Sequence, residues 1–574
     1  MTEAFTSNRL FLWMLGGLFL VSSFYYVPNT GGTGLHLPMN IVAWLTACWG
    51  IGIAFLLSVV RRVFYYPRHW FLILAFPGLV ILGGLLADVN LPEEWFFRQL
   101  FILGGVAFLF ALFQFNPNVK ALDGGLVIIV VATFLHAVIG ILQLHYPVVL
   151  QNRLPLASMP IPIGVFQQVN NHASFLATGI VVTLYTLTRP SFRKGWLSGL
   201  LVLFTLPAAF YVILQSGSRT GLLGLVLAIP ILFICRRRQF FERKWIVLVA
   251  VLLSLSTVFV GRYGLDQASA KVATAATNPA SSARVTIYSI GLELLAKEPL
   301  HGHGIGNFVR AWVPQAADYY RRNPGVYMPE SISHPHNELL FWVIEGGAIA
   351  VVGLVLTIFG IMYGLYRCGF QRGGGYAAML LPISLHTQVE LPFYTSVLHW
   401  FLWLFLLFLP LRHQVRAVCL RVSGSFQRLM QIVIVLFVFF SSLFLVDVLD
   451  AQADLNSSLN DRDKPPPHLQ VALRNPYFKP DAELVAMRTN LYSGIESNET
   501  ERVVEYVKWA DGYIKDKPVL MLYIDLIKAE RFLRPETYGC GAVKRALRMY
   551  PHVANLQERG LECRSQSMPN LLKR

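Results

Sequence analysis

Long apolar runs alternate with short polar connections over most of the chain. Most of the runs approach the length of about 20 residues that an α-helix needs to cross the hydrocarbon core of a bilayer. The pattern therefore predicts an all-α, polytopic membrane protein with about 13 transmembrane helices. The predicted spans cover residues about 10–27, 40–60, 70–87, 99–115, 124–144, 172–188, 196–215, 221–235, 245–260, 338–366, 376–391, 396–411 and 429–449.

Basic residues lie mainly in every second connection between these runs. Arg61 and Arg62 end the second run, whereas the turn before that run contains no Lys or Arg. The first run is too long for a typical signal peptide and lacks a small-residue cleavage site, so we expect it to be retained. By the positive-inside rule the N-terminus then faces the cytoplasm and the C-terminus faces outward. A long outer loop follows the ninth run, at about residues 261–336.

Composition agrees with a membrane location. Of the 574 residues, 55% are hydrophobic and only 14% are charged, whereas soluble domains carry about 25% charged residues. The formal net charge of +16 is also typical of proteins that bind nucleic acids. Because the cations gather in the predicted inner connections, we expect contact with membrane lipid and no nucleic-acid partner.

The last part of the chain is more polar, and we expect two domains. Residues 1–449 form the predicted transmembrane domain, and residues 450–574 form a smaller outer domain after a stiff linker at Pro465–Pro467. The outer domain has the helical pattern of tetratricopeptide-like hairpins, without a clean period. Its Cys540 and Cys563 can form a disulfide if this domain lies outside the cytoplasm.

The most informative polar cluster is the hexapeptide 333–338, directly before the tenth apolar run. Pro335 disfavours a helical conformation for His334, so the helix should begin just beyond it, with Asn337 as a good N-cap. His336 then lies at the positive end of the helix dipole, which favours a neutral imidazole that can act as a general base. A polar loop whose histidines only cap a helix explains the same residues.

Three further outer turns carry polar side chains where lipid meets water. Gln168 and Asn170 precede the sixth run and suit hydrogen bonds to sugar hydroxyls, although asparagine here can also cap a helix. Arg219 lies on the side where cations are scarce, and its guanidinium suits a phosphate or, alternatively, lipid headgroups. His386 and Glu390 are costly near membrane depth unless they face a cavity.

The long outer loop adds one arginine and two histidines. Arg284 begins a segment whose polar start and apolar continuation predict a helix along the membrane surface. His301 and His303, together with the two histidines of the hexapeptide, raise the question of a metal site. Their spacing matches no zinc motif and their glycine neighbours indicate a turn, so we expect no metal. We also expect no cofactor. No nucleotide-binding glycine loop occurs on the inner side, which argues against a nucleotide-driven pump.

At this point the chain resembles a known family. The stretch from His334 to Leu340, with Glu345 following, is similar to the signature of the O-antigen ligase and polymerase superfamily. The Gln168–Asn170 stretch, the turn after His386 and the helical tail resemble its protein-glycosylating branch. That branch comprises the bacterial O-oligosaccharyltransferases, which modify pilins and other periplasmic proteins.

The resemblance implies a reaction and a location. A preassembled glycan would pass from undecaprenyl pyrophosphate to a serine or threonine hydroxyl of a periplasmic protein or pilin, without nucleotide or metal and with inversion. We therefore expect a multi-pass protein of the bacterial inner membrane whose active site and C-terminus face the periplasm.

The resemblance also assigns residue roles. The family's catalytic histidine maps onto His336, its pyrophosphate-binding arginines onto Arg219 and Arg284, and its motif glutamine onto Gln168. We expect the first three side chains to open onto one outward-facing pocket. The other predicted substrate-binding residues are Asn170, His334, Asn337, His386 and Glu390.

Two other functions stay open. An O-antigen ligase or polymerase would use a sugar hydroxyl as acceptor, and the helical tail and the Gln-Asn stretch favour a protein acceptor over this. A transporter or flippase for the lipid-linked glycan would need no base at an outer helix start. It would also carry polar residues spread through its spans, whereas here they gather at one face.

Overall fold

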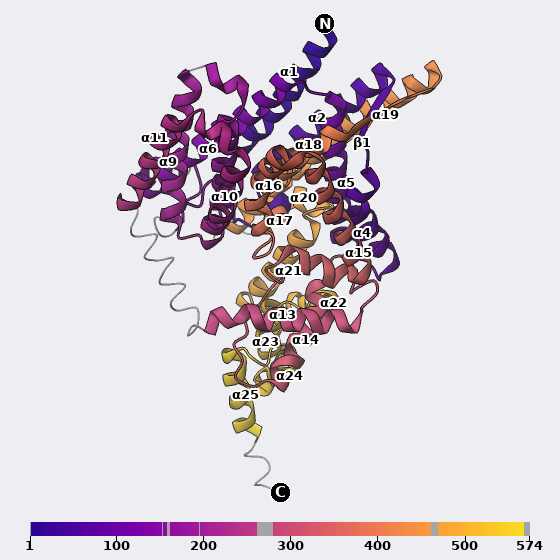
Figure 1. The fold of residues 1–574 in the computed structure, drawn as a ribbon. Helices are drawn as coiled ribbons and strands as arrows, with labels where there is room; N and C mark the ends of the chain where they lie inside the picture. The colour runs from indigo at the N-terminus through magenta and orange to yellow at the C-terminus, as the bar shows by residue number, and fades with distance from the viewer. Residues whose placement is uncertain are drawn as a thin grey trace. The chain divides into compact units, whose positions relative to one another are not determined.

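The chain is α-helical along almost all of its described length (Figure 1). The computed structural model describes residues 2–151, 153–157, 161–194, 196–260, 279–460 and 469–567. Each predicted apolar run lies largely in helix, which confirms the all-α fold.

Within these residues, seven helices are long and apolar enough to cross a membrane. The all-α polytopic membrane fold is therefore confirmed, while the count of about 13 spans stays a prediction, since the other predicted spans fall in shorter or more polar helices. The seven helices are Pro38–Arg61, Pro92–Phe115, Val119–His145, Ser198–Ser216, Arg219–Phe241, Glu338–Arg367 and Gly424–Leu459.

The helices group into two compact units, each assembled from three separate segments of the chain. The tail that begins near residue 450 belongs to the second unit together with two earlier segments. Unit 1 comprises Met1–Phe76, Phe101–Ala273 and Val355–Gln452, and unit 2 comprises Pro77–Leu100, Thr274–Leu354 and Ala453–Arg574.

Unit 1 is built around α8 (Val169–Leu187), which is almost entirely buried. Small residues let its neighbours approach closely, and Gly179 leaves room for Thr133 of α6. Helix α8 packs against α6 (Val119–His145), α9 (Trp196–Ser216), α10 (Arg219–Phe241) and α16 (Gly369–His386). The other long helices of this unit are α1 (Thr2–Gly16), α2 (Pro38–Arg61), α11 (Lys244–Val260) and α18 (Val397–Leu411), with parts of α5 (Pro92–Phe115), α15 (Glu338–Arg367) and α19 (Gly424–Asn460).

A short antiparallel sheet in unit 1 joins two segments far apart in the sequence. Strand β1 (Val63–Pro67) follows α2 and pairs with β2 (Val415–Cys419), so that Tyr65 lies opposite Ala417. Both strands are five residues long, too short for the apolar pattern to reveal. The ladder satisfies the backbone where the chain leaves α2, and Leu420 N–H extends it by donating to Arg62 O (2.8 Å).

Unit 2 contains the helical tail and the helices of the long loop. Consecutive tail helices pack on one another, as their pattern predicts, and Cys540 of α24 forms a disulfide with Cys563 of α25. The helices are α4 (Ala75–Leu86, from Pro77 onward), α13 (Pro279–Lys297), α14 (Phe308–Arg322), α20 (Gln470–Arg474), α21 (Lys479–Glu496), α22 (Thr500–Asp516), α23 (Leu520–Leu533), α24 (Cys540–Met549) and α25 (Ala554–Ser567).

Helix α15 is interrupted at Gly347, where the apolar pattern predicts an unbroken span. Gly347 has φ 58° and ψ −153°, a backbone conformation open essentially only to glycine. A Cβ on this residue would also lie 2.5 Å from the backbone nitrogen of Gly302. The sequence prediction of one continuous helix over 338–366 is therefore wrong at this point, because a loop of the chain is inserted against the helix.

The inserted loop satisfies the backbone groups that the interruption exposes. The N–H groups of His303 and Gly304 donate to the carbonyls of Ile344 (3.1 Å) and Glu345 (3.0 Å). On the other side of the break, Ala348 and Ile349 donate to the carbonyls of the loop residues 299 (2.8 Å) and 300 (3.2 Å). Discontinuous helices survive at membrane depth only when neighbouring protein groups take over such bonds, and here the loop does so on both sides.

A buried ion pair lies next to the break. Arg98 of α5 and Glu345 of α15 form it, with exposed fractions of 4% and 1%. The other oxygen of Glu345 accepts a hydrogen bond from Gly306 N–H (3.1 Å). The Arg98 guanidinium also stacks over the rings of Phe341 (4.4 Å) and Trp342 (4.7 Å). The pair therefore ties α5, the inserted loop and the first half of α15 together.

Removing one partner of this pair should destabilise unit 2 strongly. Arg98→Met leaves the Glu345 carboxylate buried without its cation, which costs about 3–5 kcal/mol for such pairs. We expect this loss in the free energy of unfolding, measured by urea titration of the detergent-solubilised chain. Adding Glu345→Gln to Arg98→Met should recover part of it, because the uncompensated charge is then gone.

A matched control is Arg545→Met, which breaks an exposed ion pair with Asp511 (2.8 Å) in the same unit. Exposed pairs contribute at most about 1 kcal/mol, so this variant should unfold nearly as the wild type does. Equal losses in Arg98→Met and Arg545→Met would contradict the structural role of the buried pair.

The disulfide should stabilise the end of the tail. It closes a loop between residues 23 apart, with the two Cα atoms 5.7 Å apart, and a loop of that length corresponds to about 3 kcal/mol in the chain-entropy model. Cys540→Ser should therefore raise the hydrogen-exchange rates of α24 and α25 in the full chain and leave α21 unchanged. Cys419→Ser, at an exposed free cysteine, is the control and should leave all three helices unchanged.

Candidate active site

Three of the predicted binding residues meet in unit 1. Gln168 and Asn170 lie at the start of α8, and Glu390 lies in the loop after α16. The side-chain amides of both α8 residues donate hydrogen bonds to Glu390, Asn170 Nδ2 at 2.9 Å from Oε1 and Gln168 Nε2 to Oε2. We call Gln168, Asn170 and Glu390 the amide–carboxylate cluster.

Glu390 keeps its negative charge in this cluster. Burial by itself raises the pKa of this carboxyl, but His386 and the two amide donors outweigh burial and lower the pKa below its ordinary value. The carboxylate is half-buried, with a side-chain exposure of 20%. It therefore presents a fixed anion that can orient hydroxyl or ammonium groups of a ligand.

The capping explanation for the asparagines is wrong. Helix α8 begins at Val169 with Gln168 as its N-cap residue, and no side chain caps it. Asn170 is therefore inside the first turn of α8, and its side-chain amide bonds residues outside this helix. Its Oδ1 accepts a hydrogen bond from Ser218 Oγ (2.7 Å), so one asparagine links Glu390 to the start of α10.

Arg219 follows directly after this link. Ser218 caps α10, since its Oγ accepts from Gly221 N–H (3.3 Å), and Arg219 is the first residue of the helix. The Arg219 side chain is exposed. Arg219 therefore lies one residue after the serine that bonds Asn170, at the positive end of a helix dipole.

Behind the cluster lies a buried polar chain of which the sequence showed only one member. His386 is fully buried, its Nε2 lies 3.9 Å from Glu390 Oε2, and its Nδ1 is hydrogen-bonded to Ser174 Oγ (2.8 Å). The 3.9 Å separation is too long for a hydrogen bond, so His386 acts on Glu390 through space. Ser174 also contacts His399 Nε2 (3.2 Å). The position of Ser174, one helical turn after Asn170, was the signal that sequence reasoning missed.

The predicted histidine cluster lies in unit 2, at the start of α15. Asn337 caps the helix as predicted, because its Oδ1 accepts from Leu340 N–H (2.9 Å). Pro335 is buried two residues before Asn337, and the first helical residue is Glu338. Helix capping is thus performed by Asn337 and not by the histidines.

His336 has an unusual backbone conformation. Its φ is +51°, in the left-handed region that few residues other than glycine adopt. His336 N–H donates to His334 Nδ1 (3.3 Å), and the two imidazole rings lie edge to face with centroids 4.5 Å apart. Both side chains are half-buried. Backbone outliers of this kind concentrate at functional sites, which is a reason to place chemistry at His336.

Arg284 and the loop histidines have different surroundings. Arg284 is exposed near the start of α13. His303 Nε2 donates to Leu294 O (2.9 Å) and His301 Nδ1 donates to Gly302 O (2.9 Å), so both rings are bound to the backbone of the loop. Among the described residues, no three His, Cys, Asp or Glu side chains are grouped as a metal ion requires.

Two family models match the chain. The first, described as O-antigen ligase, matches residues 202–355 and so includes Arg219, Arg284, His336 and Glu345. The second, described as the C-terminal part of a virulence factor membrane-bound polymerase, matches residues 376–559, which include Glu390. The two matches follow one another along the chain and leave Gln168 and Asn170 outside. No curated protein matches the chain.

The matches agree with the geometry. The first one covers the broken α15 with its histidine cluster and inserted loop, and the second one covers the end of α16 and the helical tail. Seven apolar helices among the described residues fit a multi-pass membrane protein. The chain belongs to the O-antigen ligase and polymerase superfamily.

Proposed function

We propose that this chain transfers a preassembled oligosaccharide from undecaprenyl pyrophosphate to serine or threonine hydroxyls of periplasmic proteins or pilin. The superfamily performs glycan transfer of the ligase and polymerase type. The observation that carries the residue-level proposal is the placement of His336: a half-exposed imidazole in a left-handed backbone conformation, one residue before the N-cap of α15.

His336 acts as the general base in this proposal. A hydroxyl is a poor nucleophile at neutral pH, so the attacking oxygen must lose its proton as it bonds to the anomeric carbon. The imidazole of His336 accepts that proton. His334 positions it, since the hydrogen bond from His336 N–H to His334 Nδ1 (3.3 Å) and the ring contact restrain the residue.

Arg219 and Arg284 stabilise the leaving group. As the bond between the anomeric carbon and the phosphate oxygen breaks, the pyrophosphate keeps the electron pair and gains negative charge. Guanidinium groups placed at that position stabilise the transition state more than the ground state. Both arginines are exposed at helix starts, so each can reach a lipid-linked pyrophosphate. A single displacement of this kind inverts the anomeric carbon and involves no metal step.

The remaining predicted residues bind the substrate in this scheme. The amide–carboxylate cluster offers hydrogen-bonding groups to the sugar hydroxyls, with Glu390 anionic and His386 acting on it from behind. Asn337 fixes the start of α15 and thereby the place of His336. The proposal requires His336, Arg219 and Arg284 to act on one substrate.

The tail supports an outward-facing location. Disulfides persist in oxidising compartments such as the bacterial periplasm, and Cys540 is bonded to Cys563. We therefore place the tail and the active site on the periplasmic side of the inner membrane. Tail helices without catalytic motifs suit the docking of a protein acceptor.

A second candidate is an O-antigen ligase or polymerase that uses a sugar hydroxyl as acceptor. Both matched families favour it, since one is described as a ligase and the other as a polymerase. The two functions separate when purified chain and lipid-linked glycan are incubated with a pilin and with a core oligosaccharide, because only the true acceptor gains the glycan mass. A flippase would modify neither acceptor.

His336→Asn should abolish transfer without disturbing the fold. Asparagine tolerates the left-handed backbone that His336 occupies, so the local structure persists, whereas an amide cannot accept the proton. Loss of a general base lowers the rate by about 10²–10⁴-fold. The measurement is the initial rate of glycan transfer in a reconstituted assay, with correct folding checked by the thermal unfolding midpoint.

His334→Asn is the matched control. It should reduce the rate less than His336→Asn does, because it removes only a positioning contact. A wild-type rate in His336→Asn would remove this residue from the mechanism, and a larger loss in His334→Asn would move the base to the neighbouring histidine.

Arg219→Lys should also slow transfer. An ammonium keeps the charge but cannot make the paired hydrogen bonds of a guanidinium to phosphate. We expect a rate loss on the order of 100-fold, at the lower end of the loss from removing one oxyanion donor. Arg237→Lys, an exposed arginine near the other end of α10, is the control and should keep the wild-type rate. Equal rates for both variants would assign Arg219 to headgroup anchoring instead.

A further inference from the structure

A buried arginine without an acidic partner lies near the end of α10. Arg236 is only 7% exposed. Its Nε and Nη2 donate to Thr188 Oγ1 (3.1 and 2.9 Å), and its guanidinium lies 5.3 Å from the centre of the Tyr185 ring. Among the described residues, no carboxylate lies within ion-pairing distance of it. Its backbone leaves the helical conformation there, with φ −113° and ψ 17°.

Further cations act on Arg236, and the carboxylate of Asp123 is already bonded to other residues. Arg189 and Arg372 both repel the charge of Arg236. Arg189 pairs with Asp123 at 2.7 Å, and Ser191 donates to the other oxygen of the same carboxylate. Asp123 is therefore fully engaged and does not balance the remaining positive charge.

Arg412, just beyond α18, adds another guanidinium to the group. Burial lowers its pKa, and the charge of Arg189 acts in the same direction. Its only hydrogen bond in the described part of the chain goes to a carbonyl, Pro117 O (3.2 Å). Burial and then the charges of Arg412, Arg372 and Arg189 lower the pKa of the neighbouring His413. We call Arg189, Arg236, Arg372 and Arg412 the Arg236 cluster.

The positive-inside rule does not account for the burial of Arg236. That rule concerns cations that water solvates at the inner ends of spans, as it does the exposed Arg237 and Arg238 on the next two positions of α10. Taking a guanidinium out of water is costly unless an opposite charge compensates it. Of the four arginines, Arg236 is buried, Arg189 and Arg412 are half-buried and Arg372 is exposed. The uncompensated charge therefore centres on Arg236, which fits an anion that binds beside it.

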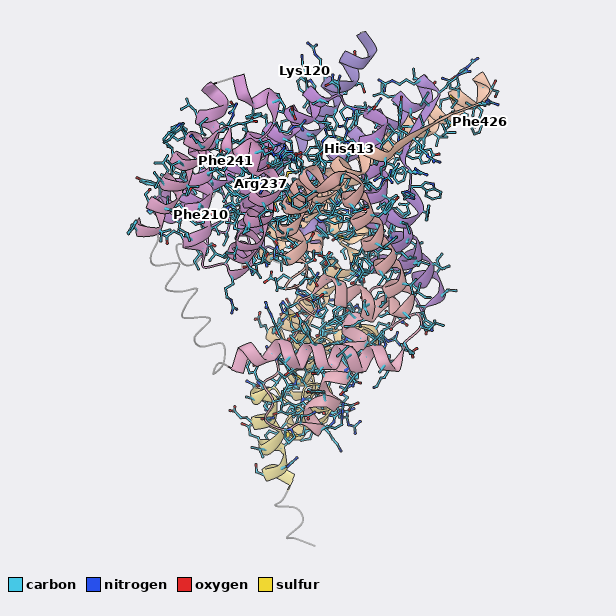
Figure 2. The ribbon with its side chains drawn as sticks, in the orientation of Figure 1. Lys120, Phe210, Arg237, Phe241, His413 and Phe426 are labelled. Carbon is cyan, nitrogen blue, oxygen red and sulfur yellow. A yellow bond between two sulfur atoms is a disulfide. The ribbon has the colours of Figure 1, made fainter. Side chains whose placement is uncertain are left out.

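The helices that carry Arg236 and Arg372 also expose apolar side chains, which suits an amphipathic ligand. Helices α10 and α16, which carry Arg236 and Arg372, expose large apolar side chains at Ile234 (61%), Phe241 (77%) and Phe370 (69%). Figure 2 labels Phe241, Arg237 and His413 in this part of unit 1. An anion with acyl chains would cover the apolar side chains and meet the guanidiniums at once.

We propose that the Arg236 cluster binds a phosphate-bearing anion, the headgroup of an anionic phospholipid. Basic pockets between transmembrane helices are typical headgroup sites, and guanidinium forks match phosphate oxygens. Thr188 and Tyr185 hold Arg236 in place, and Asp123 with Ser191 holds Arg189. The site uses residues outside the proposed catalytic machinery and does not depend on it.

The test compares lipid binding by the full chain in detergent. The probes are phosphatidylglycerol, zwitterionic phosphatidylcholine and inorganic phosphate. Native mass spectrometry counts retained lipids, and the thermal unfolding midpoint reports stabilisation. We expect phosphatidylglycerol to raise the midpoint and to be retained as a bound molecule, and phosphatidylcholine to do neither.

Arg236→Gln should weaken phosphatidylglycerol retention by about tenfold or more, the effect of losing one or two charge-assisted hydrogen bonds. Arg237→Gln removes the same charge from the next, exposed position and should retain the lipid as the wild type does. If Arg236→Gln does not fold, Arg412→Gln takes its place with the same control.

Each outcome decides the proposal. Equal loss in the Arg236 and Arg237 variants, or equal retention of both lipids by the wild type, would overturn it, because diffuse surface charge would then suffice. Stabilisation by inorganic phosphate alone, lost in Arg236→Gln, would keep the anion site and identify a free phosphate as its ligand. None of these readouts involves glycan transfer, so they stand apart from the proposed function.

Discussion

The break in α15 and the buried ion pair beside it are the constraint on which the candidate catalytic residue depends. Gly347 ends the first half of α15 in a conformation only glycine adopts, and the loop 299–304 takes over the freed backbone bonds. Arg98 and Glu345 then fasten that half-helix to α5. His336 lies two residues before this anchored segment. Its position therefore depends on the contacts of Glu345 and Gly347, further along α15.

Unit 1 positions its polar groups by a different route. There the amide–carboxylate cluster sits at helix ends, where backbone direction changes and side chains from separate helices can converge. Asn170 bonds both Glu390 and Ser218, so the starts of α8 and α10 and the loop after α16 share one hydrogen-bond network. His386 and Ser174 extend the network into the buried interior. Among the described residues, Gln168 Oε1 and His386 Nε2 are buried without a hydrogen-bond partner, so the network keeps open positions that a ligand can fill.

The sequence predicts what depends on local pattern and misses what depends on distant partners. Helical spans, the N-cap at Asn337 and the helical tail follow from periodicity and from residue preferences within a few positions. The break at Gly347 does not, because glycine in an apolar run is common and only the loop around residue 300 makes it a break. Arg98 lies at the start of an apolar run, as basic residues that flank membrane spans commonly do. The sequence therefore gives no sign of its partner, which is 247 residues away. Strands β1 and β2 are also not predictable from local pattern, because each forms a strand only by pairing with the other.

The dipole of helix α10 bears on both proposals, because Arg219 and Arg236 lie near its opposite ends. Its 23 residues span about 34 Å, close to the thickness of the hydrocarbon core. Arg219 lies at its positive dipole end, which is unfavourable for a cation alone and favourable once an anion binds there. Arg236 lies toward the negative end, where the dipole offsets part of the cost of burying it. The dipole of one helix therefore fits both proposals, since it favours an anion beside Arg219 at its start and eases the burial of Arg236 near its end.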